Sequence, residues 1–355
     1  MGAVRRRPDL VLPPVDKALG ACVPVDNWHN RARGSKGCGM TIISTQAWLD
    51  GGGSRGELRT QLAQNKLVRL RRGVLMPADQ PPAWELHVRR IRAVAPELGV
   101  DTLFGHVSAA VLHGLPVLPS RLGNVVVVRT GGGHGNVRPG LRAIGAQISP
   151  DDREIVSALP VTSMERTVVD LVRVLPFPEA VMIADAGLAR GLDRARLLDR
   201  TSAGRGCRMA RRALLFADAR SESPGESLSR VRIEQAGLPS PALQTEFFDE
   251  TGSVVARVDF WWEQFGLVGE FDGAVKYTGA LTPGEAPAET VFAEKRREQR
   301  LQDAGSTIVR WTWPELWDGR LETRLRRAMN RQVNGRGPAF GLAFEDSRRG
   351  RALPL

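Results

Sequence analysis

The sequence is short of cysteine, of lysine and of long apolar runs. Cys22, Cys38 and Cys207 form no Cys-x-x-Cys pair and are odd in number, so neither a zinc knuckle nor a disulfide framework can be read from them. No stretch approaches the roughly 20 apolar residues that a membrane-spanning helix needs. The first residues, Met1 to Pro14, combine arginines with prolines and lack the apolar core of a signal peptide. We therefore expect a cytoplasmic protein without membrane association.

The charge of the chain is strongly basic. The formal net charge is +11 and the sequence pI is about 10.7. Only five of the 50 basic residues are lysines. A compositional bias explains arginine in place of lysine, but it does not explain why 50 basic residues exceed 39 acidic ones. An excess of this size favours a polyanionic partner, and DNA is the partner we expect.

A length of 355 residues allows two or three domains. Composition and periodicity divide the chain into a disordered leader (1–39), a first organised module (40–80), a helix-rich middle segment (81–200), a C-terminal domain (201–335) and a disordered tail (336–355). Met40 opens the first organised segment, so either Met1 or Met40 could be the translation start.

The first organised module has the order of a small winged helix. Ser54 and Glu57 form a capping box that begins a helix, and two short strands, Leu67–Leu70 and Val74–Met76, follow around a basic turn. Helix, helix and basic hairpin together predict DNA binding through exposed arginines: Arg55, Arg59, Arg69, Arg71 and Arg72. The alternative is a helical cap whose arginines are simply solvated.

The middle segment is predicted to be mainly helical. Trp84–Ala95, Val107–His113 and Met164–Leu175 have helical patterns, and Asn124–Arg129 is a buried strand by its length and β-branching. His106 and His113 lie two helical turns apart, roughly 10 Å, which is too far to share one metal ion. We therefore expect structural histidines.

The most informative stretch is an acidic hairpin in the C-terminal third. Two apolar runs, Val254–Trp262 and Leu267–Phe271, flank a tight turn. Pairing their apolar faces places Asp259 directly opposite Glu270, with Cβ atoms roughly 5 Å apart. Two facing carboxylates repel, and a divalent cation such as Mg²⁺ or Mn²⁺ resolves the conflict. The alternative is an acidic patch on an exposed sheet face with Arg257 and Lys276 as neighbours.

Residues 41 to 190 resemble AbiEi-type antitoxins, which are winged-helix repressors of type IV toxin–antitoxin operons. The resemblance is carried by Leu67–Met76, Gly105–Leu115 and Leu159–Leu171. It implies DNA binding through the helix Ser54–Lys66 and the wing Arg69–Arg72. Operator DNA and a cognate toxin are the partners that such a family suggests.

The stretch from Gly225 to Arg331 resembles a domain family related to very-short-patch-repair endonucleases, a PD-(D/E)xK lineage. The matching blocks, in order, are Gly225–Ser227, Val258–Phe260, Gly269–Gly273, Glu294–Glu298 and Ile308–Trp313. The resemblance implies that Asp259 and Glu270 hold the metal with Glu226 nearby. It also implies that Arg297 and Arg310 face the DNA backbone. Lys295, close to the carboxylates in sequence, is a further candidate DNA-binding residue that could orient a water or steady the phosphate.

This chain departs from the superfamily pattern at one position. Where many members carry a lysine two residues after the motif glutamate, this sequence has Asp272, which could join the metal shell or pair with Arg257. Lys276 is the nearest replacement and could orient a water or steady the phosphate.

Taken together, the sequence predicts a mixed α/β fold. We expect an N-terminal winged helix, a helical middle domain and a restriction-endonuclease-like mixed sheet flanked by helices. The predicted function is Mg²⁺-dependent DNA phosphodiester hydrolysis in defence or mobile-element biology. The alternative is a non-catalytic type IV antitoxin or transcriptional repressor with a decayed nuclease fold. A weaker third interpretation is a protein-interaction module whose acidic pair meets a basic partner.

Overall fold

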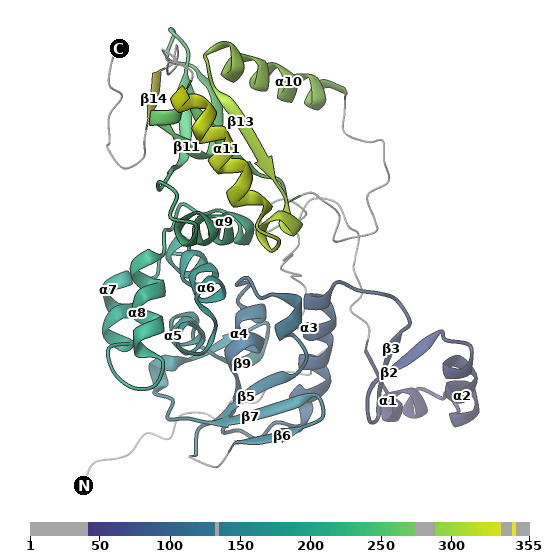
Figure 1. Ribbon diagram of the computed structural model, residues 1–355. Helices are drawn as coiled ribbons and strands as arrows, with labels where there is room; N and C mark the ends of the chain where they lie inside the picture. Colours follow the sequence, from purple (N-terminus) through teal and green to yellow (C-terminus); the bar gives the residue numbers. More distant parts are fainter. Residues whose placement is uncertain (1–41, 132–134, 274–287, 335–342, 346–355) are drawn as a thin grey trace. The chain divides into compact units, whose positions relative to one another are not determined.

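The computed structural model describes residues 42–131, 135–273, 288–334 and 343–345 (Figure 1). The predicted leader and Lys276 lie outside the described residues. The chain divides into two compact units, Met1–Leu171 and Val172–Leu355. The division falls earlier than the boundary expected after residue 200, because the helices between residues 177 and 200 belong with the C-terminal sheet domain.

The N-terminal module, residues 42–78, has the helix and hairpin order that the sequence predicts. Its elements are β1 (Ile43–Ser44), α1 (Thr45–Asp50), α2 (Arg55–Ala63), β2 (Leu67–Arg71) and β3 (Val74–Pro77). The capping box of Ser54 and Glu57 is present at the start of α2. The strands form a small sheet in the order β1-β3-β2, and Leu58, Leu67 and Leu75 form the core beneath α2.

The middle segment departs from the helical expectation because it contains a six-stranded mixed sheet in the order β6-β7-β5-β4-β9-β8. The elements are α3 (Ala83–Val94), η1 (Ala95–Glu97), β4 (Thr102–Phe104), α4 (His106–Leu112), η2 (Pro119–Arg121), β5 (Val125–Arg129), β6 (Asn136–Arg138), β7 (Leu141–Gly145), η3 (Pro150–Asp152), β8 (Arg153–Val156), β9 (Leu159–Thr162) and α5 (Met164–Val174). Of the six strands, the sequence predicts β5 alone. The others are three to five residues long and show little alternation, so they carry a weak strand signal.

His87, His106 and His113 lie in buried or partly buried positions of the middle segment. The ring of His113 lies 2.8 Å from the carbonyl oxygen of Thr162. Burial lowers the pKa of His106, which favours its neutral form. His87 is fully buried between the Leu122 carbonyl and the Ser108 hydroxyl, and burial lowers its pKa to about 4.

The second unit combines a helical part with a five-stranded mixed sheet in the order β13-β12-β11-β10-β14. Its elements are α6 (Phe177–Ala189), α7 (Arg194–Arg200), α8 (Cys207–Phe216), α9 (Pro224–Gln235), β10 (Ala242–Phe248), β11 (Val254–Trp262), η4 (Glu263–Phe265), β12 (Leu267–Phe271), α10 (Ala288–Asp303), β13 (Thr307–Trp311), η5 (Trp313–Leu316), α11 (Arg320–Asn334) and β14 (Ala343–Glu345). Strands β10, β11 and β12 form an antiparallel meander, whereas β12 and β13 are parallel. The mixed α/β fold class is therefore confirmed.

The expectation of a disordered tail is wrong for residues 343–345, which form β14. This strand pairs with β10, so that Phe247 lies opposite Phe344. Without β14, β10 would be an edge strand with unpaired N–H and C=O groups, and pairing satisfies those groups. The rest of the predicted tail lies outside the described residues.

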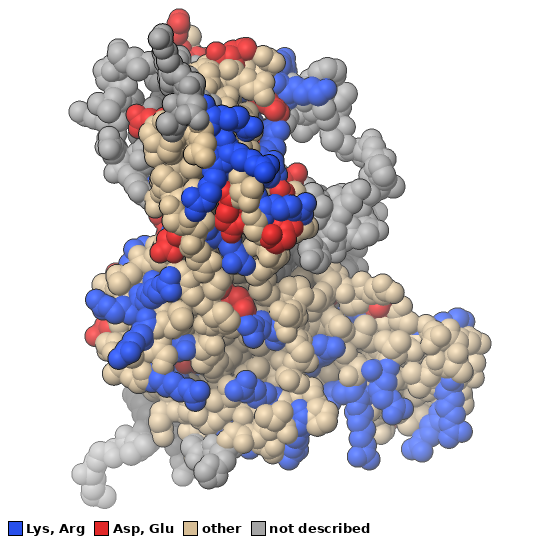
Figure 2. Space-filling model, viewed as in Figure 1, with Lys and Arg blue, Asp and Glu red and all other residues tan. Residues whose placement is uncertain are grey.

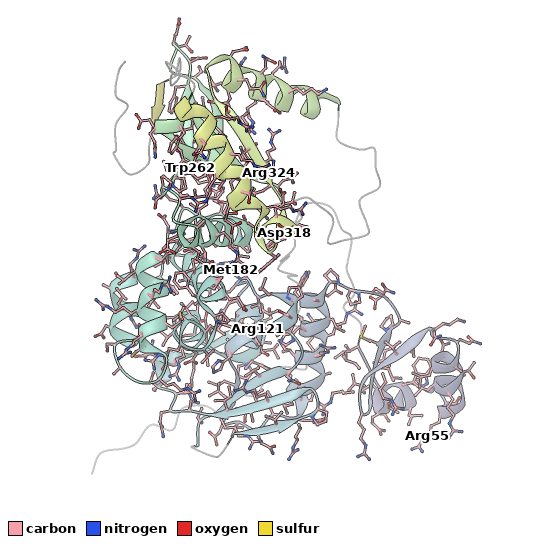
Figure 3. The ribbon with its side chains drawn as sticks, viewed as in Figure 1. Arg55, Arg121, Met182, Trp262, Asp318 and Arg324 are labelled. Atoms are coloured by element: carbon pink, nitrogen blue, oxygen red, sulfur yellow. The ribbon has the colours of Figure 1, made fainter. Side chains whose placement is uncertain are left out.

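Tryptophans fill the core of the C-terminal sheet, as the sequence indicates. Trp261, Trp262 and Trp311 are almost completely buried, and Figure 3 labels Trp262 among the side chains of this domain. The Trp311 indole N–H donates to the Ser229 hydroxyl at 2.7 Å, which joins the sheet to α9. A Cβ atom at Gly269 would lie 2.6 Å from the Trp311 ring, so glycine is needed for this packing.

In the part of the chain that the structure describes, no helix has both the length and the apolar content required to cross a bilayer.

Candidate functional site

The hairpin register expected from the sequence is confirmed for the three pairs next to the turn, whereas the expected pair of Asp259 with Glu270 lies beyond the end of the ladder. Phe260 pairs with Gly269, Trp261 with Val268 and Trp262 with Leu267. The ladder between β11 and β12 ends at Phe260 and Gly269, one step before Asp259 and Glu270. There the Asp259 carboxylate accepts a hydrogen bond from the backbone N–H of Phe271 at 2.8 Å. Asp259 therefore lies at the point where the two strands stop pairing.

Helix α9 brings Glu226 to the same place. Ser223 caps the helix by accepting from the Glu226 N–H, and Pro224 fits the first helical turn. The side chain of Glu226 is buried, and its Oε2 accepts from the Glu222 N–H at 2.9 Å and from the Gln244 amide at 2.8 Å. At Gly225 a Cβ atom would lie 1.9 Å from the Phe271 ring, so this glycine lets α9 approach the hairpin closely.

The carboxyl groups of Glu226 and Asp259 both have raised pKa values. Burial, together with the charge of Asp259, raises the pKa of Glu226 to about 7. Burial, with the charges of Glu270 and Glu222, raises the pKa of Asp259 to about 6, although the Phe271 N–H opposes that rise. Negative charge at Glu226 and Asp259 is thus only partly compensated by the protein, and such a site favours a cation.

Glu270, in contrast, is compensated by two arginines. Its Oε1 accepts from Arg297 Nη2 at 2.5 Å and its Oε2 from Arg310 Nε at 2.6 Å. Arg310 also contacts Glu298 at 2.9 Å. The parallel pairing of β12 with β13 places Arg310 directly beside Glu270. The two arginines predicted to face the DNA backbone therefore reach the site, but they contact Glu270.

The donor set is compatible with Mg²⁺ or Mn²⁺, because Mg²⁺ often uses only one or two protein carboxylates and keeps several waters. Asp259 and Glu270 would supply these carboxylates, with Glu226 beside them. In residues 42–131, 135–273, 288–334 and 343–345, no three Asp, Glu, His or Cys side chains form a ready-made metal cluster.

The remaining predicted residues of the C-terminal domain lie around this site. Asp272 is exposed directly after β12, and its backbone N–H donates to the Trp311 carbonyl at 2.8 Å. Arg257 pairs with Glu222, whereas the sequence suggests Asp272 as its partner. Lys295 is exposed on α10.

The predicted DNA-binding arginines of the N-terminal module fall into two groups. Arg55, Arg59, Arg69 and Arg72 are exposed, and basic side chains project from this module in Figure 2. Figure 3 labels Arg55 on α2. Arg71 is instead half-buried, donates to the Ala93 carbonyl at 2.8 Å and pairs with Glu97. It anchors β2 to the end of α3.

Sequence reasoning misses Gln244 and Glu222, which both contact the carboxylate site. Gln244 precedes the predicted metal ligands by a whole strand and carries no charge. The signal that could have found it is its position opposite Asp259 in a second hairpin, β10–β11, whose register the sequence analysis does not predict.

The raised pKa of Glu226 predicts a distinctive pH dependence of stability. A carboxyl group with a pKa near 7 in the folded state and 4.5 in the unfolded state binds its proton more tightly when folded. The contribution of this group to the free energy of unfolding is therefore fully present below pH 4.5. It is lost as the pH rises through about 7, a change of up to about 3 kcal/mol. We expect Glu226→Gln to flatten this decline of the melting temperature between pH 5 and pH 8. Glu250→Gln, at an exposed turn, should leave the decline as in the parent protein; an unchanged profile in Glu226→Gln would contradict the assignment.

Comparison with known proteins adds sequence relatives without a stated activity. No family model matches the chain. Two uncharacterized proteins of Mycobacterium tuberculosis, MT2308 from strain CDC 1551 and Rv2248 from strain H37Rv, are each 33% identical to it over 186 residues. The match covers 50% of this chain and 64% of each relative, so the chain spans less than two thirds of their length.

Proposed function

We propose that this protein binds DNA through its N-terminal module and hydrolyses DNA phosphodiester bonds at the carboxylate site of its C-terminal domain. One observation carries the proposal: Glu226 and Asp259 converge, largely buried, where the β11–β12 ladder ends. Carboxylates whose pKa values are raised by burial and by neighbouring negative charges are typical of functional sites. The resemblance of Gly225–Arg331 to PD-(D/E)xK endonucleases points to the same chemistry.

In the proposed reaction each side chain has a separate task. Asp259 and Glu270 would hold Mg²⁺ or Mn²⁺, which would supply Lewis acidity toward the phosphodiester. Asp259 is kept in orientation by the Phe271 N–H. Glu226, with a pKa near 7, can take up or release a proton near neutral pH. Arg297 and Arg310 offer guanidinium groups that suit phosphate oxygens as well as the Glu270 carboxylate.

The proposal is tested by incubating the full chain with supercoiled plasmid and with single-stranded DNA. Reactions contain Mg²⁺, Mn²⁺ or EDTA, and nicking or loss of full-length strand is measured on gels. Cleavage that needs the divalent ion supports the proposal. DNA binding without cleavage under every condition would contradict the hydrolase part.

The DNA-binding part predicts a change in salt dependence. Removing one contact between an arginine and a phosphate lowers the slope of log affinity against log salt by about one, so Arg69→Ala with Arg72→Ala should lower it by about two. Arg71→Ala is the matched control in the same hairpin, because its guanidinium is committed to Ala93 and Glu97. We expect this control to lower the melting temperature while the slope stays nearly constant. Fluorescence anisotropy over a salt series measures the slope, and equal slopes in all three proteins would contradict a DNA-binding hairpin.

A second candidate function is a non-catalytic repressor or antitoxin. It is favoured by the pairing of Glu270 with Arg297 and Arg310, since these contacts neutralise one of the two proposed ligands without any metal. The AbiEi-like resemblance of residues 41 to 190 suggests operator DNA and a cognate toxin as partners. A neighbouring gene whose toxicity this protein suppresses, together with the absence of cleavage, would support this candidate.

A further inference from the structure

We propose that Gln244 is a positioning residue whose side-chain amide fixes the spacing of Glu226 and Asp259. The inference rests on the proposed function, since it concerns the same carboxylate site. It assigns a role to a residue that neither charge nor motif indicates.

The position of Gln244 in the sheet is the first observation. Its neighbours Leu243 and Thr245 pair with Phe260 and Val258, so Gln244 lies opposite Asp259 in the β10–β11 register. Helix α9 supplies Glu226 from the other side, and the Gln244 amide N–H donates to Glu226 Oε2 at 2.8 Å. The Gln244 amide thus holds Glu226 at the point of the sheet where β10 faces Asp259.

The backbone of Gln244 is the second observation. Its φ of +52° lies in the left-handed region, which is unusual for a residue other than glycine and rare inside a strand. Such a conformation is energetically unfavourable and persists only where the surroundings enforce it. The strand nevertheless keeps its register on both sides of Gln244. Within β10, the unfavourable backbone conformation therefore occurs at the residue whose side chain donates to Glu226.

The neutrality of Gln244 is the third observation. Glu270 is held by two arginines, which cancel its charge. An amide supplies hydrogen-bond donors and adds no charge, so Glu226 and Asp259 keep their attraction for a cation. A lysine or arginine at this position would neutralise the pair, and an apolar side chain would remove the amide donors.

The variant Gln244→Gly distinguishes a role of this side chain in positioning Glu226 from a role of the residue in folding. Glycine adopts a φ near +52° without strain, so the full chain should unfold at an equal or higher temperature. If Gln244 serves only the backbone, the site should then remain intact. If it positions Glu226, the apparent pKa of Glu226 should rise, because the charged form loses a hydrogen-bond donor. Carboxyl ¹³C NMR titration, assigned with Glu226→Gln, measures this value.

The affinity for Mn²⁺ gives a second readout. Loss of a residue that orients ligating groups typically costs about 10–100-fold in metal affinity, and we expect a loss in that range from calorimetric titration of Gln244→Gly. Thr245→Val, at the adjacent buried position of the same strand, is the matched control and should leave both readouts unchanged.

The two readouts distinguish failure of this inference from failure of the proposed function. A titration curve of Glu226 and an Mn²⁺ affinity that are both unaltered in Gln244→Gly would overturn the positioning role. If the parent protein neither binds Mn²⁺ nor cleaves DNA, the proposed function fails, while a shifted pKa of Glu226 in Gln244→Gly would still support the positioning role.

Discussion

Replacing Asp259 with asparagine is expected to lower metal-dependent DNA cleavage by on the order of 10³-fold. This magnitude follows from the several kcal/mol that a divalent ion contributes to a phosphoryl transition state, since about 1.4 kcal/mol corresponds to a factor of ten. Asparagine retains an oxygen that accepts from the Phe271 N–H, so the end of the β11–β12 ladder should be preserved. The charge that attracts the cation is removed.

The same substitution should not weaken the fold. The charge of Asp259 contributes to the raised pKa of Glu226, and its removal should lower that pKa and relieve repulsion at neutral pH. We therefore expect a melting temperature at pH 7.5 equal to or above that of the parent protein, with unchanged affinity for DNA in EDTA. Plasmid nicking rates, anisotropy and thermal unfolding measure the three quantities.

Glu250→Ala provides the control for removal of one acidic residue from the same sheet. Glu250 is exposed at the turn between β10 and β11. Its removal should leave the cleavage rate within about twofold of the parent rate, a far smaller change than the one expected for Asp259→Asn. If Asp259→Asn cleaved DNA at the rate of the parent protein, Asp259 would have no role in the proposed reaction.

The acidic hairpin could be predicted because its register depends on local signals. The short turn between the apolar runs Val254–Trp262 and Leu267–Phe271 fixes which residues face each other, because loop length sets the register of a hairpin. The capping box at Ser54 and Glu57 is equally local and equally predictable. These predictions hold because the interacting residues are close in sequence.

The arginine contacts of Glu270 could not be predicted in the same way. Arg310 reaches Glu270 through a parallel pair, β12 and β13, whose connection includes α10, and no turn fixes the register of such a pair. Arg297 arrives from that helix. The unusual φ of Gln244 has no sequence signature either, because it results from the surroundings of a residue that is ordinary in strands and helices alike.

The second large effect is expected for Asp185, which fixes the position of α9. Asp185 on α6 is fully buried, and its carboxylate lies 2.8 Å from Arg230 Nη1 on α9. Its other oxygen accepts from the Asp218 N–H at 2.7 Å. Arg230 also donates to the Phe216 carbonyl at 2.6 Å. The pair therefore joins α6, the segment before α9 and α9 itself.

Asp185→Ala should destabilise the protein by about 3–5 kcal/mol, because it leaves the Arg230 guanidinium buried without its counter-charge. For a unit of this size the melting temperature should fall by roughly 10 °C. Arg320→Ala removes one partner of an exposed ion pair in the same unit and should cost less than about 1 kcal/mol. Differential scanning calorimetry compares the two variants.

A double variant separates the charge from the packing at this position. In Asp185→Leu with Arg230→Met no charge remains buried, so much of the stability that Asp185→Ala removes should return. Equal destabilisation by the single and the double variant would show that the hydrogen bonds, and not the unpaired charge, dominate.

The Asp185–Arg230 pair also connects stability to the proposed chemistry. Arg230 follows Glu226 by four residues, so both side chains lie on one face of α9, and a shift of the helix at Arg230 moves Glu226 as well. We expect Asp185→Ala to reduce cleavage even at temperatures where it is fully folded, and to lower the apparent pKa of Glu226 as that side chain loses its burial. Because the helical segment 177–216 belongs to the same compact unit as the sheet, its role would be to hold α9 against the hairpin.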